Sequence, residues 1–376
     1  MSRFFASRIA RLSAATFAAL TPLMGAVALS GVVAAPAHAQ YSFADLSKNT
    51  EPSIILPRTA ISLQRNMRYR PDPNKEPIYF QWSWSPRFKI GLRGPVSAGA
   101  QLVVNVTKPN GAAWLSLPVE TPELAAGAWQ DLTTPDQDET KGITGTGTYG
   151  FSVVLKNPLD GSKKVLYTGK FDVSKFKYPT GTHPGETEFF VNYDWLLPTG
   201  YIEINTENNE EAPLLSTYFW FKGDESANNP EGYVLYNGKL IYSTKSEGQG
   251  RGIADVTLTT PGVDKNRTWF RWKFSFGGVR IYHSASDQSA NTYTQHFLTK
   301  NPGQYEVKVL RGGQPARSMK FTVGADGQIV NNGLAVKNHL STTMMLMPVE
   351  IFPGTDVPYS LAPTPGAFFG NPWQMK

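Results

Sequence analysis

Residues that could do chemistry are few and scattered in this chain of 376 residues. The tightest group is the segment HSASDQS, which holds His283, Ser284, Ser286 and Asp287. A serine hydrolase needs these residue types, but the members of a triad meet in space rather than in sequence, and no Gly-x-Ser-x-Gly turn accompanies the serines. We therefore interpret the segment as a polar loop and expect no catalytic residue, no cofactor and no enzymatic activity.

Candidate metal ligands are equally dispersed. The histidines beyond the N-terminal segment are His183, His283, His296 and His339. None of them forms a His-x-x-x-His pair, and the absence of cysteine excludes thiolate sites and thiol catalysis. The acidic segments TPDQDET, with Asp136, Asp138 and Glu139, and TENNEE (206–211) offer oxygen ligands to calcium without the spacing of an EF-hand. We predict solvated loops there and no metal site.

Aromatic residues alternate along the segments YFQWSWSPRF and TWFRWKFSF, and such residues can stack on a sugar or a peptide. Trp82 and Trp84 share one face if the first segment is a strand, because side chains two positions apart point to the same side. The interior of a β-sandwich requires the same alternation. We name Trp82 and Trp84 as candidate ligand-stacking residues and interpret the second segment as core.

Short alternating runs bounded by Gly, Pro and Asn recur after residue 40, which is the pattern of antiparallel strands. Helical turns are expected only within Pro122–Leu132. Asn-Gly pairs at 110–111, 237–238 and 332–333 favour two-residue hairpin turns, because both residue types tolerate positive φ. The predicted fold class is therefore all-β.

One hairpin pattern occurs twice. Gly147, Tyr149, Phe151 and Val153 align with Gly303, Tyr305, Val307 and Val309, and the return strands KFDV (170–173) and KFTV (320–323) follow. This pattern resembles the closing hairpin of immunoglobulin-like and fibronectin type III-like β-sandwich modules of exported bacterial proteins. The resemblance implies two tandem antiparallel β-sandwich domains. It also implies that Tyr149 and Tyr305 are structural residues whose hydroxyl groups bond back to the main chain.

The N-terminal segment is typical of a secretory signal. Arg3, Arg8 and Arg11 precede an apolar stretch that ends in the cleavage pattern Ala37-His38-Ala39. We predict cleavage near Ala39 and a secreted or periplasmic location. An uncleaved anchor is the alternative, because the stretch is long enough to span a bilayer. No later apolar run has that length, so we expect no transmembrane segment in the mature chain.

The domain boundaries follow from the hairpins and from a linker rich in glycine and proline. The predicted parts are a signal peptide (1–39), an extended N-terminal segment (40–69), a first sandwich (70–180), a linker (181–189), a second sandwich (190–325) and an irregular C-terminal extension with a hairpin and an apolar, Pro-rich end (326–376).

The C-terminal extension has many apolar residues and few charges, so it would expose considerable apolar surface if it were solvated. We expect it to dock, either along its own domains as a brace or on a partner. The candidate partner-docking residues are Met344, Met345, Phe352, Phe368, Phe369 and Trp373.

The formal net charge is +6, and the three N-terminal arginines account for half of it, so no nucleic-acid partner is expected. Basic residues concentrate between Arg65 and Arg93, and acidic residues between Glu203 and Glu231. These segments form either two solvated faces or complementary surfaces of two molecules.

These observations predict an exported, non-enzymatic binding or assembly protein of the cell envelope or exterior. Its partner is expected to be a protein, a cell-surface component or a second copy of the chain. One alternative is a carbohydrate-binding or carbohydrate-active protein that uses exposed aromatic residues. The second is a periplasmic chaperone-like protein.

Overall fold

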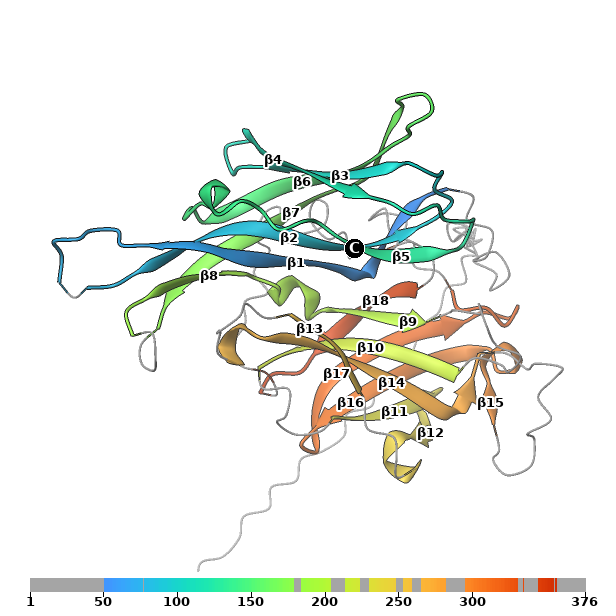
Figure 1. The fold of residues 1–376 in the computed structure, drawn as a ribbon. Helices are drawn as coiled ribbons and strands as arrows, with labels where there is room; N and C mark the ends of the chain where they lie inside the picture. Colours follow the sequence, from blue (N-terminus) through green and yellow to red (C-terminus); the bar gives the residue numbers. More distant parts are fainter. Residues whose placement is uncertain are drawn as a thin grey trace, which may run out of the picture. The chain divides into compact units, whose positions relative to one another are not determined.

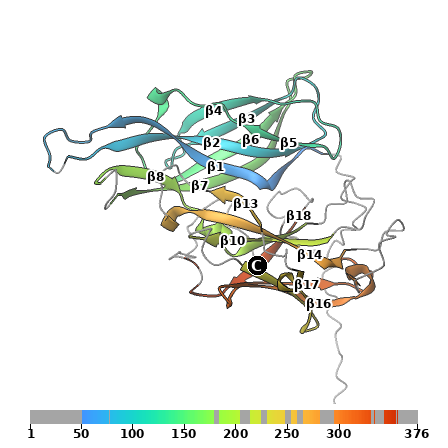
Figure 2. The same ribbon diagram turned by 60° about the horizontal axis from the view of Figure 1, so that its bottom comes forward.

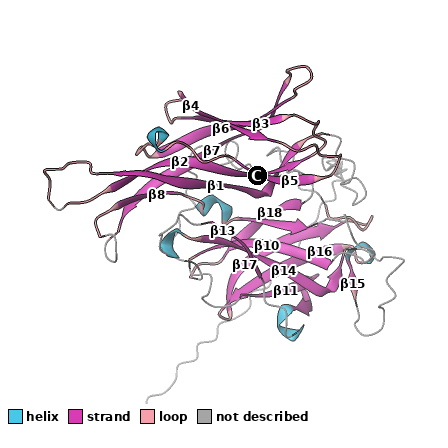
Figure 3. Ribbon diagram, viewed as in Figure 1, coloured by secondary structure: helices cyan, strands magenta, loops and turns pink. Residues whose placement is uncertain are grey.

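The structure is a computed structural model, drawn as a ribbon in Figures 1 and 3. It describes residues 51–76, 78–178, 184–203, 214–223, 230–247, 253–258, 265–281, 295–330, 334, 344–354 and 356. The elements over these residues are strands and short 3₁₀ helices, which confirms the predicted all-β class. None of the helices in the described part of the chain is long and apolar enough to cross a bilayer.

The first sheet takes its strands from the first half of the described chain. They are β1 (Ser53–Tyr69), β2 (Gln81–Arg93), β3 (Gln101–Thr107), β4 (Ala113–Glu120), β5 (Trp129–Thr133), β6 (Gly147–Lys156), β7 (Lys163–Lys177) and β8 (Thr187–Val191). Their order is β1-β2-β8-β7-β6-β3-β4, and β5 pairs with β2. The neighbours are antiparallel except β2 and β8, which pair in parallel at Gln81 and Thr187, so the sheet is mixed.

The second sheet takes its strands from the rest of the chain. They are β9 (Thr199–Glu203), β10 (Leu214–Lys222), β11 (Pro230–Tyr236), β12 (Lys239–Ser243), β13 (Ile253–Leu258), β14 (Trp269–Arg280), β15 (His296–Phe297), β16 (Gly303–Arg311), β17 (Gln314–Val323) and β18 (Met344–Ile351). The order is β12-β11-β16-β17-β18-β9-β10-β14-β13, and β15 pairs in parallel with β14. Strand β18 therefore joins the two halves of the sheet.

The second sheet curls until it is nearly closed. Tyr242 of β12 packs against β14, where its ring lies edge-on 6.0 Å from that of Phe276. Gly278 of β14 also faces Tyr242, because a Cβ on Gly278 would lie 2.6 Å from the Tyr242 ring. Glycine therefore allows the first strand in the order to approach a strand near the other end, which gives the sheet a barrel-like form.

Two clusters of buried apolar residues form the core, and β18 contributes to both. Leu346 belongs to the cluster that contains Trp84 and most of the first sheet. Met345 and Met347 belong to the cluster of the second sheet. Successive residues of a strand point to opposite faces, so one short strand supplies both clusters. The aromatic residues of the segment TWFRWKFSF that were interpreted as core, Phe270, Trp272, Phe274 and Phe276, are buried, as expected.

The two predicted hairpins adopt the same register. Tyr149 pairs with Phe171 and Tyr305 with Phe321, and in each pair the rings stack, at centroid distances of 5.6 Å and 5.2 Å. Gly147 and Gly303 begin the strands with positive φ, at 123° and 152°. The two-fold pattern in the sequence is therefore confirmed as two equivalent hairpins, β6–β7 and β16–β17.

Turns are present at the predicted Asn-Gly pairs that the structure describes, but the two-residue form is confirmed at 237–238 only, because Asn110 lacks positive φ and three residues separate Lys108 from Ala112. Asn237 and Gly238 both have positive φ, at 47° and 78°, and they connect β11 to β12. Asn110 and Gly111 lie in the turn between β3 and β4, where the Asn110 side chain accepts from the N–H of Ala112. The pair at 332–333 lies outside the described residues.

The helical turn expected within Pro122–Leu132 is wrong. Leu124 instead exchanges main-chain hydrogen bonds with Val96, and Trp129–Thr133 forms strand β5 against β2. Pairing with strands that are distant in sequence outweighs the local helical preference. Strand β1 lies in the predicted N-terminal segment, and β8 begins in the predicted linker.

A buried ion pair fixes the end of β10 against the 3₁₀ helix Asp194–Leu196. The Lys222 Nζ lies 2.7 Å from Asp194 Oδ1, and both side chains are buried. The indole N–H of Trp269 donates to the same oxygen at 3.0 Å. This carboxylate therefore ties together the start of β14, the end of β10 and the segment that precedes β9.

Candidate binding surface

The two tryptophans singled out by the sequence occupy different environments. Trp84 is 1% exposed, and its ring lies edge-on to those of Trp114 and Tyr149 at 5.3 Å and 4.9 Å. Its indole N–H donates to the carbonyl of Gly145. Trp82 is half-buried. The Trp84 indole is therefore part of the core, whereas solvent reaches Trp82.

Two guanidinium groups lie over the Trp82 ring. The Cζ atom of Arg65 is 5.1 Å from the ring centroid and that of Arg68 is 5.6 Å from it. Arg68 is also 4.0 Å from the centroid of Phe80. These are cation–π distances. The strand register explains the arrangement, because Arg68 of β1 pairs with Trp82 of β2, and a bulge separates Arg68 from Arg65.

Two glutamates from the start of β8 hold the same arginines. Arg65 Nη2 donates to Glu188 and Arg68 Nη2 donates to Glu186. Both carboxylates are buried, whereas the arginines are partly exposed. Each arginine therefore crosses β2 with its guanidinium fixed between an aromatic ring and a carboxylate, which restricts its rotamers.

The electrostatics of Glu188 reflect its burial. Burial raises the pKa of Glu188 above its ordinary value of 4.5, although the Arg65 guanidinium and the backbone N–H of Phe189 act in the opposite direction. The nearby Glu186 carboxylate adds to the increase. Desolvation is therefore the larger effect on this carboxyl group.

Beyond these contacts, the connection between β1 and β2 extends past the other strands of their sheet (Figures 1 and 2). Lys177 Nζ lies 3.9 Å from the centroid of the Tyr79 ring. Met67 is 55% exposed and Ile78 is 49% exposed. We call the group formed by Arg65, Arg68, Tyr79, Phe80, Trp82 and Lys177 the cation–aromatic surface.

An open cleft of about 450 Å³ lies beside Met67. Its other walls are Ser83 of β2 and the segment Glu139–Gly145. This segment pairs with β2 at one position, where the N–H and C=O of Ile143 both bond to the main chain of Trp84, at 2.9 Å and 2.8 Å. Gly142 is required at the contact, since a Cβ there would lie 2.6 Å from Asn66 Nδ2 and from Ser83 Oγ.

The predicted docking residues of the C-terminal extension fall into three groups. Met344 and Met345 lie in β18, paired with Glu203 and Ile202, and Met345 is buried. Phe352 follows β18, is half-buried and donates its backbone N–H to the Ala316 carbonyl. Phe368, Phe369 and Trp373 lie outside the described residues. Residues 344–351 thus brace the second sheet.

Most of the groups weighed for catalysis or metal binding lie outside the part of the chain that the structure describes. His183, His283 and His339 lie outside the described residues, as do Ser284, Ser286, Asp287 and the segment 206–211. Asp138 caps the 3₁₀ helix Glu139–Lys141 by accepting from the N–H of Thr140. Over the described part of the chain, no three His, Asp or Glu side chains converge as a metal site would require.

His296 is the histidine that the structure describes. Its Nε2 lies 2.7 Å from the Tyr305 hydroxyl, which donates to the carbonyl of Asn301 at 2.7 Å. Burial lowers the pKa of His296 and raises that of Tyr305. The Tyr236 ring packs against both, at 5.1 Å and 5.0 Å. The cluster is a packed strand corner, as the sequence predicted for Tyr305.

The basic segment between Arg65 and Arg93 finds its acidic partners in its own sheet. Besides the two glutamate pairs, Arg87 lies 3.3 Å from Asp136 and Lys89 lies 3.2 Å from Asp131. Sequence reasoning missed these partners and assigned Glu186 and Glu188 to the linker. The alternation of Glu186, Thr187, Glu188 and Phe189 was the available signal for a strand. Comparison with protein-family models and with curated proteins finds no match.

Proposed function

We propose that this chain is an exported, non-enzymatic binding or assembly protein of the cell envelope or exterior, and that its partner is a protein that docks on the cation–aromatic surface. The observation that carries the proposal is the stacking of Arg65, Arg68 and Lys177 on Trp82, Phe80 and Tyr79. Tryptophan, tyrosine, arginine and methionine are the residues enriched at the centres of protein interfaces.

The fixed positions of the charged groups support this proposal. A partner that binds flexible arginines must order them, which costs about 0.5–1.5 kcal/mol for each immobilised side chain. Arg65 and Arg68 are already held by Glu188 and Glu186 and by the rings beneath them. Most of the free-energy cost of ordering these two side chains is therefore met when the protein folds and not when the partner binds.

We also propose that the two sheets derive from immunoglobulin-like sandwich modules. The equivalent registers of β6–β7 and β16–β17 support this. So does the hydrogen bond from Tyr305 to the main chain four residues upstream, which is the contact expected of a tyrosine corner. Tyr149 occupies the matching place, where a Cβ at Gly145 would lie 2.9 Å from its hydroxyl.

Single-cysteine cross-linking tests the proposed surface directly. The chain has no cysteine, so Met67→Cys or Ile78→Cys creates one unique attachment point. Matched controls are Leu159→Cys and Leu240→Cys, which are also exposed but lie on other hairpins. After incubation with an envelope fraction, a thiol-reactive cross-linker is expected to trap one discrete protein from positions 67 and 78 only.

A second set of variants distinguishes specific binding from non-specific adsorption. Arg65→Gln with Arg68→Gln is expected to abolish the adduct, whereas Lys239→Gln on the β11–β12 hairpin is expected to leave it unchanged. Equal adducts from all four cysteine positions, or adducts that survive the double arginine substitution, would contradict the proposal. Oligosaccharide-dependent quenching of tryptophan fluorescence that disappears in Trp82→Phe would instead favour the carbohydrate alternative.

A further inference from the structure

Arg317 of β17 carries a fully buried guanidinium group that faces a carboxylate from beyond the last strand. Its Nη2 lies 2.5 Å from Oδ2 of Asp356, and both side chains are 0% exposed. The remaining nitrogens donate to main-chain carbonyls, Nε to Trp220 and Nη1 to Ala316. The guanidinium lies over the ring of Phe221 at 4.5 Å. The arginine is therefore held in place by strands on either side of β18.

Two more groups are directed at the same carboxylate. The backbone N–H of Lys222, at the end of β10, donates to Asp356 Oδ1 at 3.0 Å. Arg311, at the end of β16, is also buried and has its Nη1 3.7 Å from the same oxygen. Donors from β10, β16 and β17 thus surround one carboxyl group, and charge-assisted hydrogen bonds of this kind are the strong ones.

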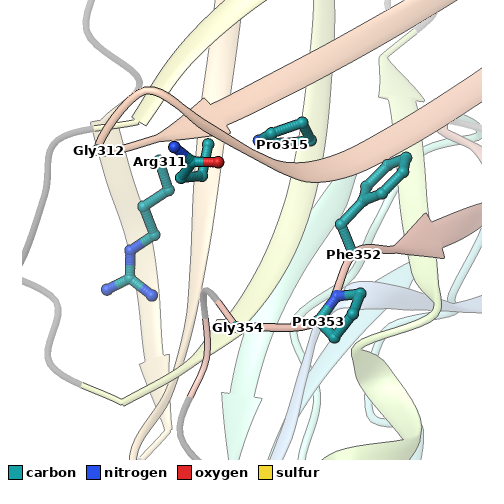
Figure 4. A pocket seen from close by; sticks show the side chains of 7 residues that line it. Arg311, Gly312, Pro315, Phe352, Pro353 and Gly354 are labelled. Carbon is teal, nitrogen blue, oxygen red and sulfur yellow. The ribbon is translucent and has the colours of Figure 1, made fainter. Parts of the chain in front are cut away.

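A pocket of about 590 Å³ is lined in part by Arg311 of this cluster. Arg311 and Gly312 lie on one side of the pocket and Phe352, Pro353 and Gly354 on the other (Figure 4). The donors belong to strands, whereas Asp356 arrives on the turn that follows β18, in which Gly354 has φ of 96°. The Asp356 carboxylate, on the turn after β18, therefore occupies a positively charged site that is built by the strands.

We propose that Arg311, Arg317 and the Lys222 N–H form a carboxylate-binding site, which Asp356 occupies within the same chain and which thereby latches the turn that follows β18. A buried arginine that loses its counter-ion is strongly destabilising, because the desolvated guanidinium charge has lost the carboxylate that compensated it. The site therefore takes a small carboxylate from solution when the Asp356 side chain is removed.

Chemical rescue tests the site. Asp356→Ala is expected to lower the melting temperature by about 5 °C or more, because it removes the carboxylate that faces two buried guanidinium groups. Sodium formate or acetate is expected to restore at least half of the loss in a saturable manner, whereas sodium chloride at equal ionic strength does not. The matched control is Asp136→Ala, which removes an exposed partner of Arg87 and is expected to show no response to formate.

Two results would overturn the carboxylate site. One is an equal effect of formate and chloride on Asp356→Ala. The other is an equal formate response in Asp356→Ala and Asp136→Ala. If Asp356→Ala does not fold, refolding it in formate and in chloride at equal ionic strength provides the same test, and recovery of folded protein in formate only is the result expected for the carboxylate site.

Hydrogen exchange tests the latch. The backbone N–H of Phe352 donates to the Ala316 carbonyl beside the pocket. We expect this N–H to exchange at least five-fold faster in Asp356→Ala than in the unmodified chain, and formate to slow the exchange again. Equal exchange rates in the two proteins would show that Asp356 does not hold this segment.

Discussion

The hydroxyl group of Tyr305 donates to the carbonyl oxygen of Asn301, four residues earlier, at 2.7 Å. Tyr305 is buried at the start of β16, and its ring stacks on Phe321 of the neighbouring strand. This contact closes the corner by which the chain enters the β16–β17 hairpin. It also satisfies a main-chain acceptor that no strand partner reaches.

The first prediction concerns this corner. Tyr305→Phe keeps the ring but removes the hydroxyl that contacts both Asn301 and His296, so we expect the free energy of unfolding to fall by about 1–2 kcal/mol. Urea denaturation measures the change. Tyr236→Phe is the control, because its hydroxyl bonds to Pro302 at an exposed position and should matter less. A larger loss in the control would contradict the structural role of Tyr305.

The second prediction concerns pH. The pKa of Glu188 is higher in the folded protein than its ordinary value of 4.5, so the folded state binds a proton more tightly than the unfolded state does. This contribution is therefore fully present below about pH 4.5 and is lost as the pH rises through the folded pKa. Glu188→Gln is expected to flatten this decrease in stability.

Denaturation midpoints measured from pH 4 to pH 8 on the two proteins provide the test, and only their difference is attributed to Glu188. Glu350→Gln serves as the control, since the Glu350 side chain is 58% exposed. A pH dependence that is the same with and without Glu188 would show that burial of this carboxyl group does not influence stability.

The third prediction concerns the pair formed by Lys222 and Asp194. Lys222→Met removes one charge and leaves the Asp194 carboxylate buried with the Trp269 N–H, so we expect a loss of about 3 kcal/mol. The combination of Lys222→Met with Asp194→Asn should recover part of this loss, because no charge then remains. Thermal or urea unfolding measures the stability of each variant. If the losses of the two single variants add up to the loss of the double variant, Lys222 and Asp194 are not energetically coupled.

The fourth prediction concerns export. N-terminal sequencing of the protein recovered from outside the cytoplasm is expected to begin at Gln40, since Ala37-His38-Ala39 is the predicted cleavage pattern. Ala39→Leu replaces the small residue before the cut and should cause a longer form to accumulate. Recovery of the full-length chain in the unmodified protein would favour the anchored alternative.

The parts of the fold that could be predicted from the sequence are those specified by neighbouring residues. The β6–β7 and β16–β17 hairpins were visible because their alternation and positive-φ glycines act locally. The Asn237-Gly238 turn was visible for the same reason. Strand β5 was not, because its pairing with β2 is decided by residues about forty positions away.

The candidate surface was predicted only in part. Trp82 was identified from its alternation with Trp84, but its two arginines find their carboxylates on β8, more than a hundred residues further along the chain. Counting the charges along a sequence groups residues that are adjacent in the chain, whereas an ion pair forms between residues that the strand topology brings together. The partners of Arg65 and Arg68 therefore depend on the parallel pairing of β2 with β8.

The position of β18 has a consequence for biosynthesis. This strand lies between β17 and β9, yet it is the last described strand to leave the ribosome. Until residues 344–351 have emerged, the facing edges of β9 and β17 lack their partner and the second sheet cannot close. The second sheet is thereby kept from completing its fold until long after the segment that the sequence predicts to be an export signal has emerged.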